Sequence, residues 1–220
     1  MSAADVRFAH VAFDLDGTLI DSRHDLASCV NHVLRTMRLP ELDPKVLYGY
    51  VGEGARVLVE RALGPSRCAR FDEGVALFME YYGDHLLDAT RPYPGMVELL
   101  DALAERGVAL SVLTNKPIGF SRAILDGLAL TPRFVGVIGS DSLPTRKPDP
   151  AGLDELRRLS ATPRERTLLV GDSGIDVETA RAGGVAFCGV SWGLSPDTLL
   201  AAAPERVVDD AAEILALVAA

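Results

Sequence analysis

Cysteine is scarce in this sequence, which has only three cysteines among 220 residues. Cys29, Cys68 and Cys188 are widely separated and show no spacing typical of metal ligands. An odd number of cysteines cannot all pair with one another. The sequence therefore excludes a disulfide framework or a cysteine-based zinc site, and we expect buried free thiols.

Long apolar runs are absent as well. No stretch of eighteen consecutive apolar residues occurs, so no transmembrane helix is expected. The first ten residues, MSAADVRFAH, lack a basic segment followed by an apolar one, so they do not read as a secretory signal. We therefore expect a cytoplasmic protein with no membrane partner.

Positive charge is in deficit. The chain has 22 lysines and arginines against 31 aspartates and glutamates, for a formal net charge of −9. Nucleic acids and anionic membranes are bound through basic patches, so this balance argues against both as partners. Any phosphate that the protein binds must be met by a few local groups.

Hydrophobic residues, by contrast, make up 48% of the chain, enough for a packed core without covalent cross-links. Between residues 23 and 90 the spacing is helical, with no convincing strand. Two apolar stripes carry this pattern: Leu26, Val30, Val33, Leu34 and Met37, then Phe71, Val75, Phe78, Tyr82 and Leu86.

On either side of this segment, short apolar strands alternate with amphipathic helices, a pattern typical of an α/β protein with a parallel sheet. We expect helices at residues 96–106, 118–128, 151–160 and 209–218, and a strand at 185–190. The predicted fold is a doubly wound, Rossmann-like parallel sheet formed by residues 1–22 and 91–220, with an inserted all-helical cap formed by residues 23–90. The segments after Asp21 and around residues 90–94 are the expected hinges.

The most informative segment is VAFDLDGTL at residues 11–19. Apolar residues typical of a buried strand lead into Asp14 and Asp16, and Gly17 permits a sharp turn directly after them. Two carboxylates held this close resist joint ionisation unless a cation, a shared proton or strong hydrogen bonds stabilise them. A hard metal ion is the simplest source of this stabilisation. The alternative is that Asp16 and Gly17 only form a turn, with no catalytic role.

Other predicted strands end in polar residues too. VALSVLTN ends on Thr114 and Asn115, and TLLVGD ends on Asp172, with Asp176 four residues later. In an open parallel sheet the carboxyl ends of the strands line one crevice, so these side chains are expected to meet there. Lys147 precedes a helix expected to begin near Pro148, where the helix dipole disfavours a cation, so this lysine calls for a nearby anion.

The set DLDGT, TN, KP and GDSGID resembles the motifs of the haloacid dehalogenase superfamily of phosphotransferases, from about Phe8 to the final predicted helix. Within it, the chain is most similar to the phosphoglycolate phosphatase group. That likeness rests on PYPG at 92–95, VLTNKP at 112–117, VGDSGIDVETARAGG at 170–184 and VSWG at 190–193.

The resemblance implies a Mg²⁺-dependent phosphomonoesterase that acts on a small phosphorylated metabolite through an aspartyl-phosphate, with 2-phosphoglycolate as the expected substrate. Asp14 is the expected nucleophile, since a carboxylate can attack phosphorus and divide one displacement into two. Asp16 is the expected general acid and base, and its backbone carbonyl is a further candidate metal ligand.

The remaining predicted roles concern charge. Attack by a carboxylate on a phosphate dianion requires fixed positive charge and hydrogen-bond donors, for which Mg²⁺, Lys147 and Thr114 are the candidates. Asp172 is the expected second metal ligand besides Asp14. Asp176 either holds a metal-bound water, orients Lys147, or is simply an acid in the first turn of a helix. Asn115 is a candidate for substrate contact, with a helix cap as the alternative.

Within the insertion, the segment GYVGEGARVL breaks the helical pattern with three glycines followed by Arg56. This loop is expected to contact the organic part of the substrate through Arg56. The alternative is that Arg56 is a solvated charge on the surface. It isn't a dinucleotide-binding fingerprint, because the third glycine of that motif is missing and no strand precedes it.

Other functions are open at this point. A sugar-phosphate phosphatase or phosphomutase of the same fold is one, although phosphomutases of this superfamily carry a histidine where this chain has Leu26. A non-catalytic module or a receiver that accepts a phosphoryl group on an aspartate is another, since receivers also place acids and a lysine at strand ends. The protein is expected to be a monomer or a homodimer.

Overall fold

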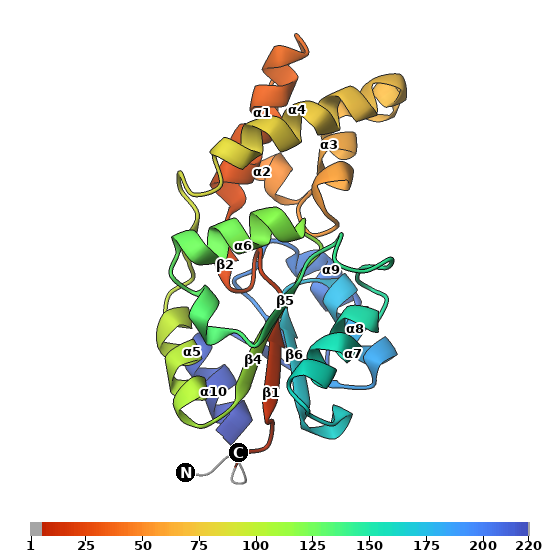
Figure 1. Ribbon diagram of the computed structural model, residues 1–220. Helices are drawn as coiled ribbons and strands as arrows, with labels where there is room; N and C mark the ends of the chain where they lie inside the picture. The colour runs from red at the N-terminus through yellow and green to blue at the C-terminus, as the bar shows by residue number, and fades with distance from the viewer. Residues whose placement is uncertain (1–5, 220) are drawn as a thin grey trace.

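The computed structural model describes residues 6–219, so the first five residues and the last, which belong to the predicted core, lie outside the described part. A six-stranded sheet forms the lower body of the molecule, and a group of helices stands above the end of its strands (Figure 1). Every pairing in this sheet is parallel. The predicted α/β architecture with a doubly wound parallel sheet is confirmed.

The central strand of the sheet comes from the segment that leads into Asp14. In spatial order the strands are β5 (Gly136–Ile138), β4 (Ala109–Leu113), β1 (His10–Phe13), β6 (Thr167–Gly171), β7 (Ala186–Val190) and β8 (Val207–Val208). Both faces of β1 are buried, as expected of a parallel strand covered by helices on either side. Val11 and Phe13 face one apolar cluster, whereas Ala12 faces the other, which reflects the two-residue period of a strand.

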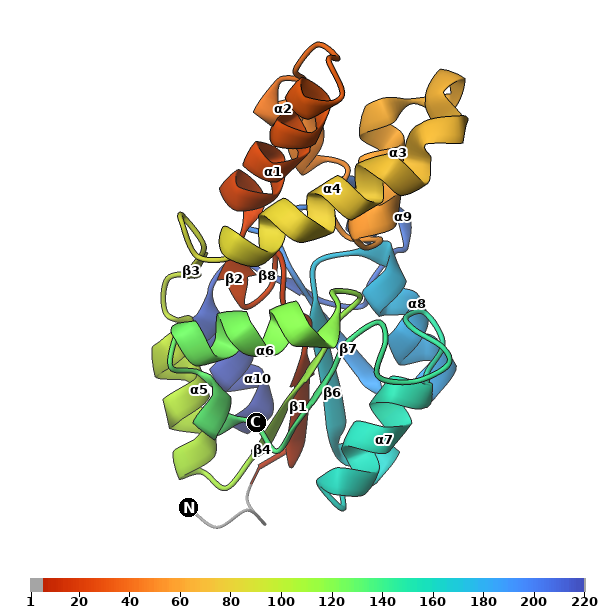
Figure 2. The same ribbon diagram turned by 45° about the horizontal axis from the view of Figure 1, so that its top comes forward.

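Helices cover the two faces of the sheet. On one face α5 and α10 pack against each other, and on the other α7 packs against α8 and α8 against α9; α6 lies near the carboxyl end of the strands, below the helical group (Figures 1 and 2). Their bounds are α5 (Met96–Glu105), α6 (Ile118–Gly127), α7 (Ala151–Leu159), α8 (Gly174–Gly183), α9 (Pro196–Ala201) and α10 (Ala211–Ala219), with 3₁₀ turns η3 (Thr131–Arg133) and η4 (Arg164–Arg166). The helices expected at 96–106, 118–128, 151–160 and 209–218 are all present, each within two residues at either end.

The helical group is formed by the segment expected to be all-helical. It contains α1 (Arg23–Thr36), α2 (Pro44–Tyr48), α3 (Ala55–Leu63), the 3₁₀ helix η2 (Pro65–Arg70) and α4 (Phe71–Asp84). The first predicted stripe is buried throughout; of the second, Phe78, Tyr82 and Leu86 are buried, while Phe71 and Val75 are half-buried. The boundaries of core and cap at residues 22/23 and 90/91 stay a prediction.

Two short strands join the insertion to the rest of the chain. β2 (Ile20–Asp21) and β3 (Arg91–Pro92) pair antiparallel, so the way into the helical group and the way out of it lie side by side. Asp25, at the start of α1, accepts hydrogen bonds from the backbone N–H groups of Ala89 and Thr90 and from the Thr90 hydroxyl, at 2.7 to 3.1 Å. The two connecting segments are therefore held together by backbone pairing and by one buried carboxylate.

Two expectations need correction. Cys68 is exposed, because it lies on the outer surface of η2, while Cys29 and Cys188 are buried as expected and all three are free thiols. The helix expected near Pro148 begins only at Ala151, because the Asp149 carboxylate accepts a hydrogen bond from the Ala151 N–H and forms a turn before the helix.

Candidate active site

The carboxyl ends of the three neighbouring strands β4, β1 and β6 bring the predicted polar residues together. The Asp14 N–H donates to the Val170 carbonyl at 2.9 Å and the Thr114 N–H donates to Ile138, so the sheet ladders continue one residue beyond each strand. Asp14, Thr114 and Asp172 therefore sit at the same edge of the sheet, and all three are nearly inaccessible to solvent. Their shared position at the carboxyl ends of the parallel strands is the arrangement that the sequence predicted.

Asp14, Asp172 and Asp176 form a compact group of acids. One carboxylate oxygen of each lies within 4.8 Å of the others, and all three side chains are buried. Burial, followed by the charge of Asp14, raises the pKa of Asp172 to about 8. Burial also raises the pKa of Asp14 to about 6, although Lys147 opposes this effect. Such carboxylates cannot all carry charge without an additional cation.

Lys147 supplies one positive charge to this group. Its Nζ lies 2.8 Å from Asp14 Oδ1 and donates a hydrogen bond of 2.7 Å to Asp176 Oδ1. Burial disfavours the charged lysine, but the two carboxylates outweigh it, so the pKa of Lys147 lies above its ordinary value. The sequence predicted an anion beside Lys147, and the structure places two aspartates there, Asp14 and Asp176.

The three acids fit a hard divalent cation. Three buried carboxylates share only one ammonium, that of Lys147, so a further positive charge is needed if all three are ionised. Carboxylate oxygens are the ligands that Mg²⁺ prefers, and it commonly takes only one or two of them together with waters and substrate phosphate. Asp14 and Asp172 are the candidate direct ligands.

Asp176 has two neighbours that fix its position. Besides Lys147, its carboxylate accepts hydrogen bonds from the Ser173 N–H and hydroxyl, at 3.1 and 2.6 Å, at the start of α8. Of the roles left open by the sequence, orienting Lys147 and closing the first turn of the helix therefore coexist in the same side chain. A metal-bound water at Asp176 stays a prediction.

Asp172 is held by one backbone donor and one side-chain donor. The Leu194 N–H donates to its Oδ2 at 2.7 Å, and the Thr18 hydroxyl donates to its Oδ1 at 3.3 Å. Gly17, in the turn after the two acids, has a φ of +86°, and a Cβ at this position would lie 2.3 Å from Asp172 Oδ2. The glycine that follows the acids is therefore required for the close approach of the two loops, as well as for the turn.

Asp16 has different neighbours from Asp14. Its carboxylate lies outside the group of three acids and instead accepts hydrogen bonds from Lys116 Nζ, at 2.8 and 3.0 Å, and from the Ser22 hydroxyl at 2.5 Å. Its side chain is thus placed beside the nucleophile candidate without joining the acidic group. Metal binding by its backbone carbonyl stays a prediction.

Lys116 was not singled out from the sequence. It directly follows Thr114 and Asn115, its side chain is only 5% exposed, and its N–H donates to the Thr114 hydroxyl oxygen at 3.1 Å. That contact leaves the Thr114 hydroxyl proton free for another acceptor. The missed signal is the position of Lys116 immediately after the strand-end hydroxyl, where its side chain lies at the same edge of the sheet.

Asn115 and Arg56 differ in their placement. The Asn115 amide donates to the Lys147 carbonyl at 3.2 Å and lies beside the acids. Arg56 lies on the exposed side of α3, where it pairs with Glu60 and Asp72 at 2.7 and 2.9 Å. The structure therefore does not bring Arg56 to the other candidate residues, and its predicted contact with substrate gains no support from this arrangement.

The loop before α3 does approach the site, as its glycines suggested. Gly54 has a φ of +95°, and a Cβ there would lie 3.3 Å from the Asn115 carbonyl oxygen. The Ser195 hydroxyl, just before α9, donates to the Val51 carbonyl at 3.0 Å. The insertion is therefore in direct contact with the loops that carry the candidate site residues.

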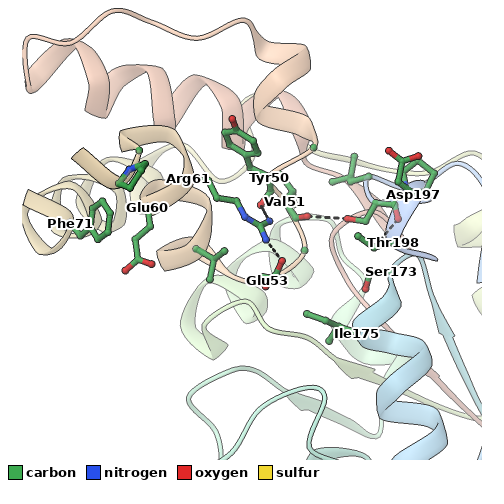
Figure 3. Close-up of a pocket in the computed structure, with 18 of the residues that line it drawn as sticks. Tyr50, Val51, Glu53, Glu60, Arg61, Phe71, Ser173, Ile175, Asp197 and Thr198 are labelled. Carbon is green, nitrogen blue, oxygen red and sulfur yellow. Dashed lines mark hydrogen bonds and ion pairs between the residues drawn. The ribbon is translucent and has the colours of Figure 1, made fainter. Parts of the chain in front are cut away.

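Besides a hollow of about 770 Å³ lined by Glu53, Asn115 and Lys147, two more lie where described residues of the insertion meet the sheet. The larger, of about 850 Å³, runs between residues 49–71 and the starts of α8 and α9, and Figure 3 shows the paired side chains of Glu53 and Arg61 at its wall. Asp14, Asp172 and Asp176 do not line this hollow. Ser173 and Ile175 line it from the side of α8, so it adjoins the back of the acidic group.

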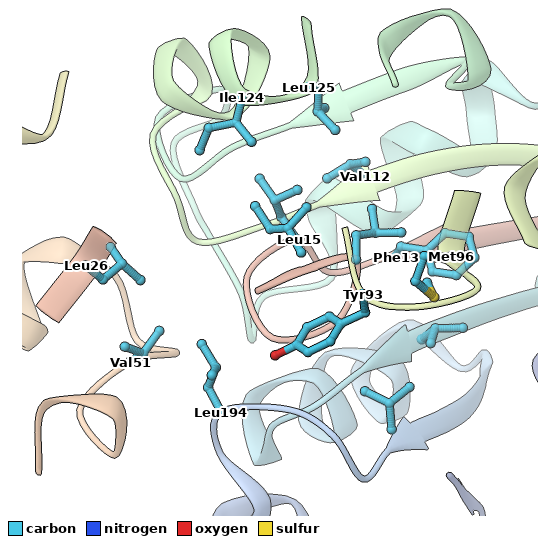
Figure 4. Close-up of a cluster of buried hydrophobic side chains, with 14 of the residues drawn as sticks. Phe13, Leu15, Leu26, Val51, Tyr93, Met96, Val112, Ile124, Leu125 and Leu194 are labelled. Atoms are coloured by element: carbon cyan, nitrogen blue, oxygen red, sulfur yellow. The ribbon is translucent and has the colours of Figure 1, made fainter. Parts of the chain in front are cut away.

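The smaller cavity, of about 40 Å³, is the one that the two candidate catalytic aspartates line. Asp14, Asp16, Thr114, Asn115 and Lys116 line it from the sheet side. Apolar side chains from the insertion close it, and Figure 4 shows two of them, Leu26 and Val51, facing the loop that carries Leu194. The cavity thus extends from the two acids into the helical group.

Comparisons with known proteins agree with this geometry. The family model described as haloacid dehalogenase-like hydrolase matches residues 11–190. The chain is 40% identical over 212 residues to a phosphoglycolate phosphatase of Rhodospirillum rubrum, covering 93% of this chain and 88% of the relative. It is 36% identical over 202 residues to one of Mesorhizobium japonicum, covering 90% and 89%.

A solved structure is similar along nearly the whole chain. The crystal structure of a predicted phosphoglycolate phosphatase from Haemophilus somnus superimposes with a TM-score of 0.89 at 33% identity, covering 96% of this chain and 98% of that one. No helix in the described part of the chain is long and apolar enough to span a membrane.

Proposed function

The chain belongs to the haloacid dehalogenase-like hydrolases, and we propose that within this family it is a Mg²⁺-dependent phosphatase that converts 2-phosphoglycolate into glycolate and phosphate. The observation that carries the reaction type is the separation of Asp14 from Asp16. Both line one cavity, yet Asp14 faces Lys147 and the acidic group, whereas Asp16 faces Lys116 and Ser22. Two carboxylates in different environments can take different roles.

In the first step, the Asp14 carboxylate attacks phosphorus, a bond forms between its oxygen and phosphorus, and the bond from phosphorus to the glycolate oxygen breaks. Asp16 gives a proton to the departing oxygen. In the second step, water attacks the phosphorus of the aspartyl-phosphate, its proton passes to Asp16, and phosphate leaves with Asp14 restored. One water is consumed for each phosphoester bond broken.

The buried cations make this attack feasible. Lys147 lies beside Asp14 and reduces repulsion between the nucleophile and the phosphate oxygens, and the Thr114 hydroxyl proton is available to one of those oxygens. Mg²⁺ held by Asp14 and Asp172 would supply further neutralisation of the phosphate charge. Asp176 acts through Lys147, whose ammonium it fixes.

The cavity favours a small leaving group. Its volume of about 40 Å³ is room for about three water-sized groups, which suits a two-carbon acid better than a sugar. Leu26 lines it where a phosphomutase of this superfamily would carry a histidine, so no base is present there for a mutase reaction. The two relatives described above are phosphoglycolate phosphatases, which supports the same substrate.

The test is phosphate release with Mg²⁺ from a panel of 2-phosphoglycolate, sugar phosphates, nucleotides and pyrophosphate, with Asp14→Asn and a chelator as controls. We expect one strongly preferred substrate, 2-phosphoglycolate, and loss of turnover in both controls. Low and uniform turnover that both controls abolish would retain the reaction type and remove the named substrate. Turnover that survives in Asp14→Asn would remove the nucleophile.

A further inference from the structure

The small cavity begins at the nucleophile and leads away from the acidic group. Asp14 and Asp16 line it, whereas Asp172, Asp176 and Lys147 do not. Phosphorus must lie next to Asp14 for attack, at the end of the cavity that Thr114 also lines, so the end of the cavity towards the insertion is the space for the part of the substrate beyond the phosphate. The groups that line it are therefore those that select the leaving group.

Among the described residues that line this cavity, Lys116 carries the only positive charge. Two contacts of its ammonium go to the oxygens of Asp16, and an ammonium has three donors. Burial disfavours the charge, but Asp16 and then Tyr82 outweigh it, so the pKa of Lys116 lies above its ordinary value. The ammonium therefore places a buried positive charge at the cavity, beside the Tyr82 hydroxyl with which it also interacts.

Tyr82 brings a second donor from the insertion. Its ring lies 4.7 Å from Lys116 Nζ, and its side chain is only 1% exposed. Its hydroxyl oxygen is close enough to the Lys116 ammonium to raise the pKa of that lysine, and its hydroxyl proton has no acceptor among the described residues. Burial raises the pKa of Tyr82 above its ordinary value, so the hydroxyl keeps its proton at neutral pH. Buried polar groups rarely lack a partner, which makes this hydroxyl a candidate for ligand contact.

The surroundings hold the ring of Tyr82 in place and offer few competing polar groups. The ring packs against Phe78 at 5.2 Å and meets Phe120 edge-on at 5.4 Å. Phe78 and Phe120 also line the cavity, together with Leu26 and Leu58. A hydroxyl-rich leaving group would leave polar atoms unsatisfied against this wall, whereas a single carboxylate can meet both donors.

We propose that Lys116 and Tyr82 together bind the carboxylate of the substrate and thereby select a two-carbon phosphorylated acid. This inference rests on the proposed phosphatase function and assigns its selectivity to one residue from the sheet edge and one from the insertion. The carboxylate lies beside the positive charge of the ammonium and accepts a hydrogen bond from the hydroxyl of the tyrosine. Substrate binding then links the insertion to the sheet through both residues.

The test compares two substrates with the same number of carbons, 2-phosphoglycolate and 2-hydroxyethyl phosphate, which carries a neutral hydroxymethyl group in place of the carboxylate. Tyr82→Phe removes the hydroxyl and no hydrogen bond seen in the structure, so its fold should be retained. We expect its KM for 2-phosphoglycolate to rise roughly tenfold, while its kinetics with 2-hydroxyethyl phosphate stay unchanged.

Lys116→Met is the second variant. It also affects Asp16, so both substrates should lose activity, and the informative quantity is the ratio of their kcat/KM values. We expect this ratio to fall by roughly a hundredfold. Tyr81→Phe, on the half-buried side of α4, and Lys45→Met, on the surface, are the matched controls and should leave the ratio unchanged.

Each outcome separates this inference from the proposed function. If both variants lose activity equally on the two substrates, or if the wild type does not prefer the carboxylate, Lys116 and Tyr82 do not select it, and the phosphatase function stands. If the wild type hydrolyses neither substrate in an Asp14-dependent way, the proposed function itself fails. A loss confined to 2-phosphoglycolate supports the inference.

Discussion

The backbone of Gly17 lies so close to Asp172 that a Cβ at Gly17 would be 2.3 Å from the Asp172 Oδ2 atom. This contact joins the turn after β1 to the end of β6, which are the two segments that carry the candidate metal ligands. The separation between the two loops thus depends on a residue without a side chain, whose φ of +86° also disfavours any other residue.

Gly17→Ala should therefore reduce phosphate release strongly. The added methyl must displace Asp172, and a displacement of about 1 Å at reacting groups costs roughly a hundredfold in rate. Steady-state kinetics measures the effect, with circular dichroism to check the fold. Gly119→Ala is the matched control, since a Cβ at Gly119 meets nothing within 4 Å. Equal activity of Gly17→Ala and wild type would show that the loop spacing is not critical.

Removal of the metal should change stability in a pH-dependent manner. In the metal-free protein the pKa of Asp172 is raised to about 8, so near pH 6 a proton occupies this carboxyl and must leave before a cation binds. A raised carboxyl pKa in the folded state also means that metal-free stability from this group is lost as pH rises towards 8. Both effects predict that Mg²⁺ raises Tm more at about pH 8 than at about pH 6.

Thermal unfolding with Mg²⁺ or with a chelator, at both pH values, measures this difference. Asp172→Asn removes the titrating carboxyl and should abolish most of the Mg²⁺ effect at either pH. A Tm increase of the same size at the two pH values would contradict the assignment of Asp172 as a ligand.

The contacts that the sequence could predict are those set by strand order. Asp14, Thr114 and Asp172 each follow an apolar strand, and parallel strands end at one edge, so local patterns were sufficient to bring them together. The position of Lys116, two residues after Thr114, was a local signal for the same edge of the sheet, but its contact with Tyr82 was not, because Tyr82 reaches it only through the packing of the insertion on the sheet.

The same reason explains the other differences. β2 and β3 have two residues each, too few to show a two-residue period, and their pairing joins segments that are 70 residues apart. Arg56 was predicted to contact substrate from its place after three glycines, but Asp72 draws it outward, a contact that depends on the packing of α3 against α4. Tertiary contacts of this kind leave no local signal.

Asp25 should stabilise the junction between the insertion and the rest of the chain. Asp25→Ala would leave the N–H and hydroxyl of buried Thr90, and the N–H of the more exposed Ala89, without their acceptor, at a cost of about 3 kcal/mol in the free energy of unfolding. Urea denaturation measures the loss. Asp88→Ala, which removes an exposed aspartate paired with His85, should cost less than about 1 kcal/mol. Equal losses of unfolding free energy in the two variants would show that the Asp25 hydrogen bonds contribute no more to stability than an exposed ion pair does.

His10 should make the fold sensitive to acid. Burial, followed by the charge of Arg157, lowers the pKa of this imidazole from 6.5 to about 4, and its Nε2 lies 2.7 Å from the Ser111 hydroxyl. Between these two pKa values the unfolded chain binds the proton and the folded chain does not, so stability falls as pH decreases from about 6.5 to about 4.

The size of this effect between about pH 7 and about pH 5 is on the order of 2 kcal/mol. It is measured as the difference between wild type and His10→Gln in urea denaturation at the two pH values, which cancels the contribution of the carboxylates. Parallel behaviour of the two proteins would mean that His10 is protonated equally in both states.

The central claim is that Asp14 carries the phosphoryl group during turnover. The most direct measurement is rapid acid quench of the enzyme with 2-phosphoglycolate labelled on its phosphate, followed by digestion and mass spectrometry of the peptide that contains residues 11–19. The account predicts one phosphoryl group on Asp14 that appears within the first turnover and disappears on a chase with unlabelled substrate. Label on any other residue, or steady turnover with no label on this peptide, would contradict it.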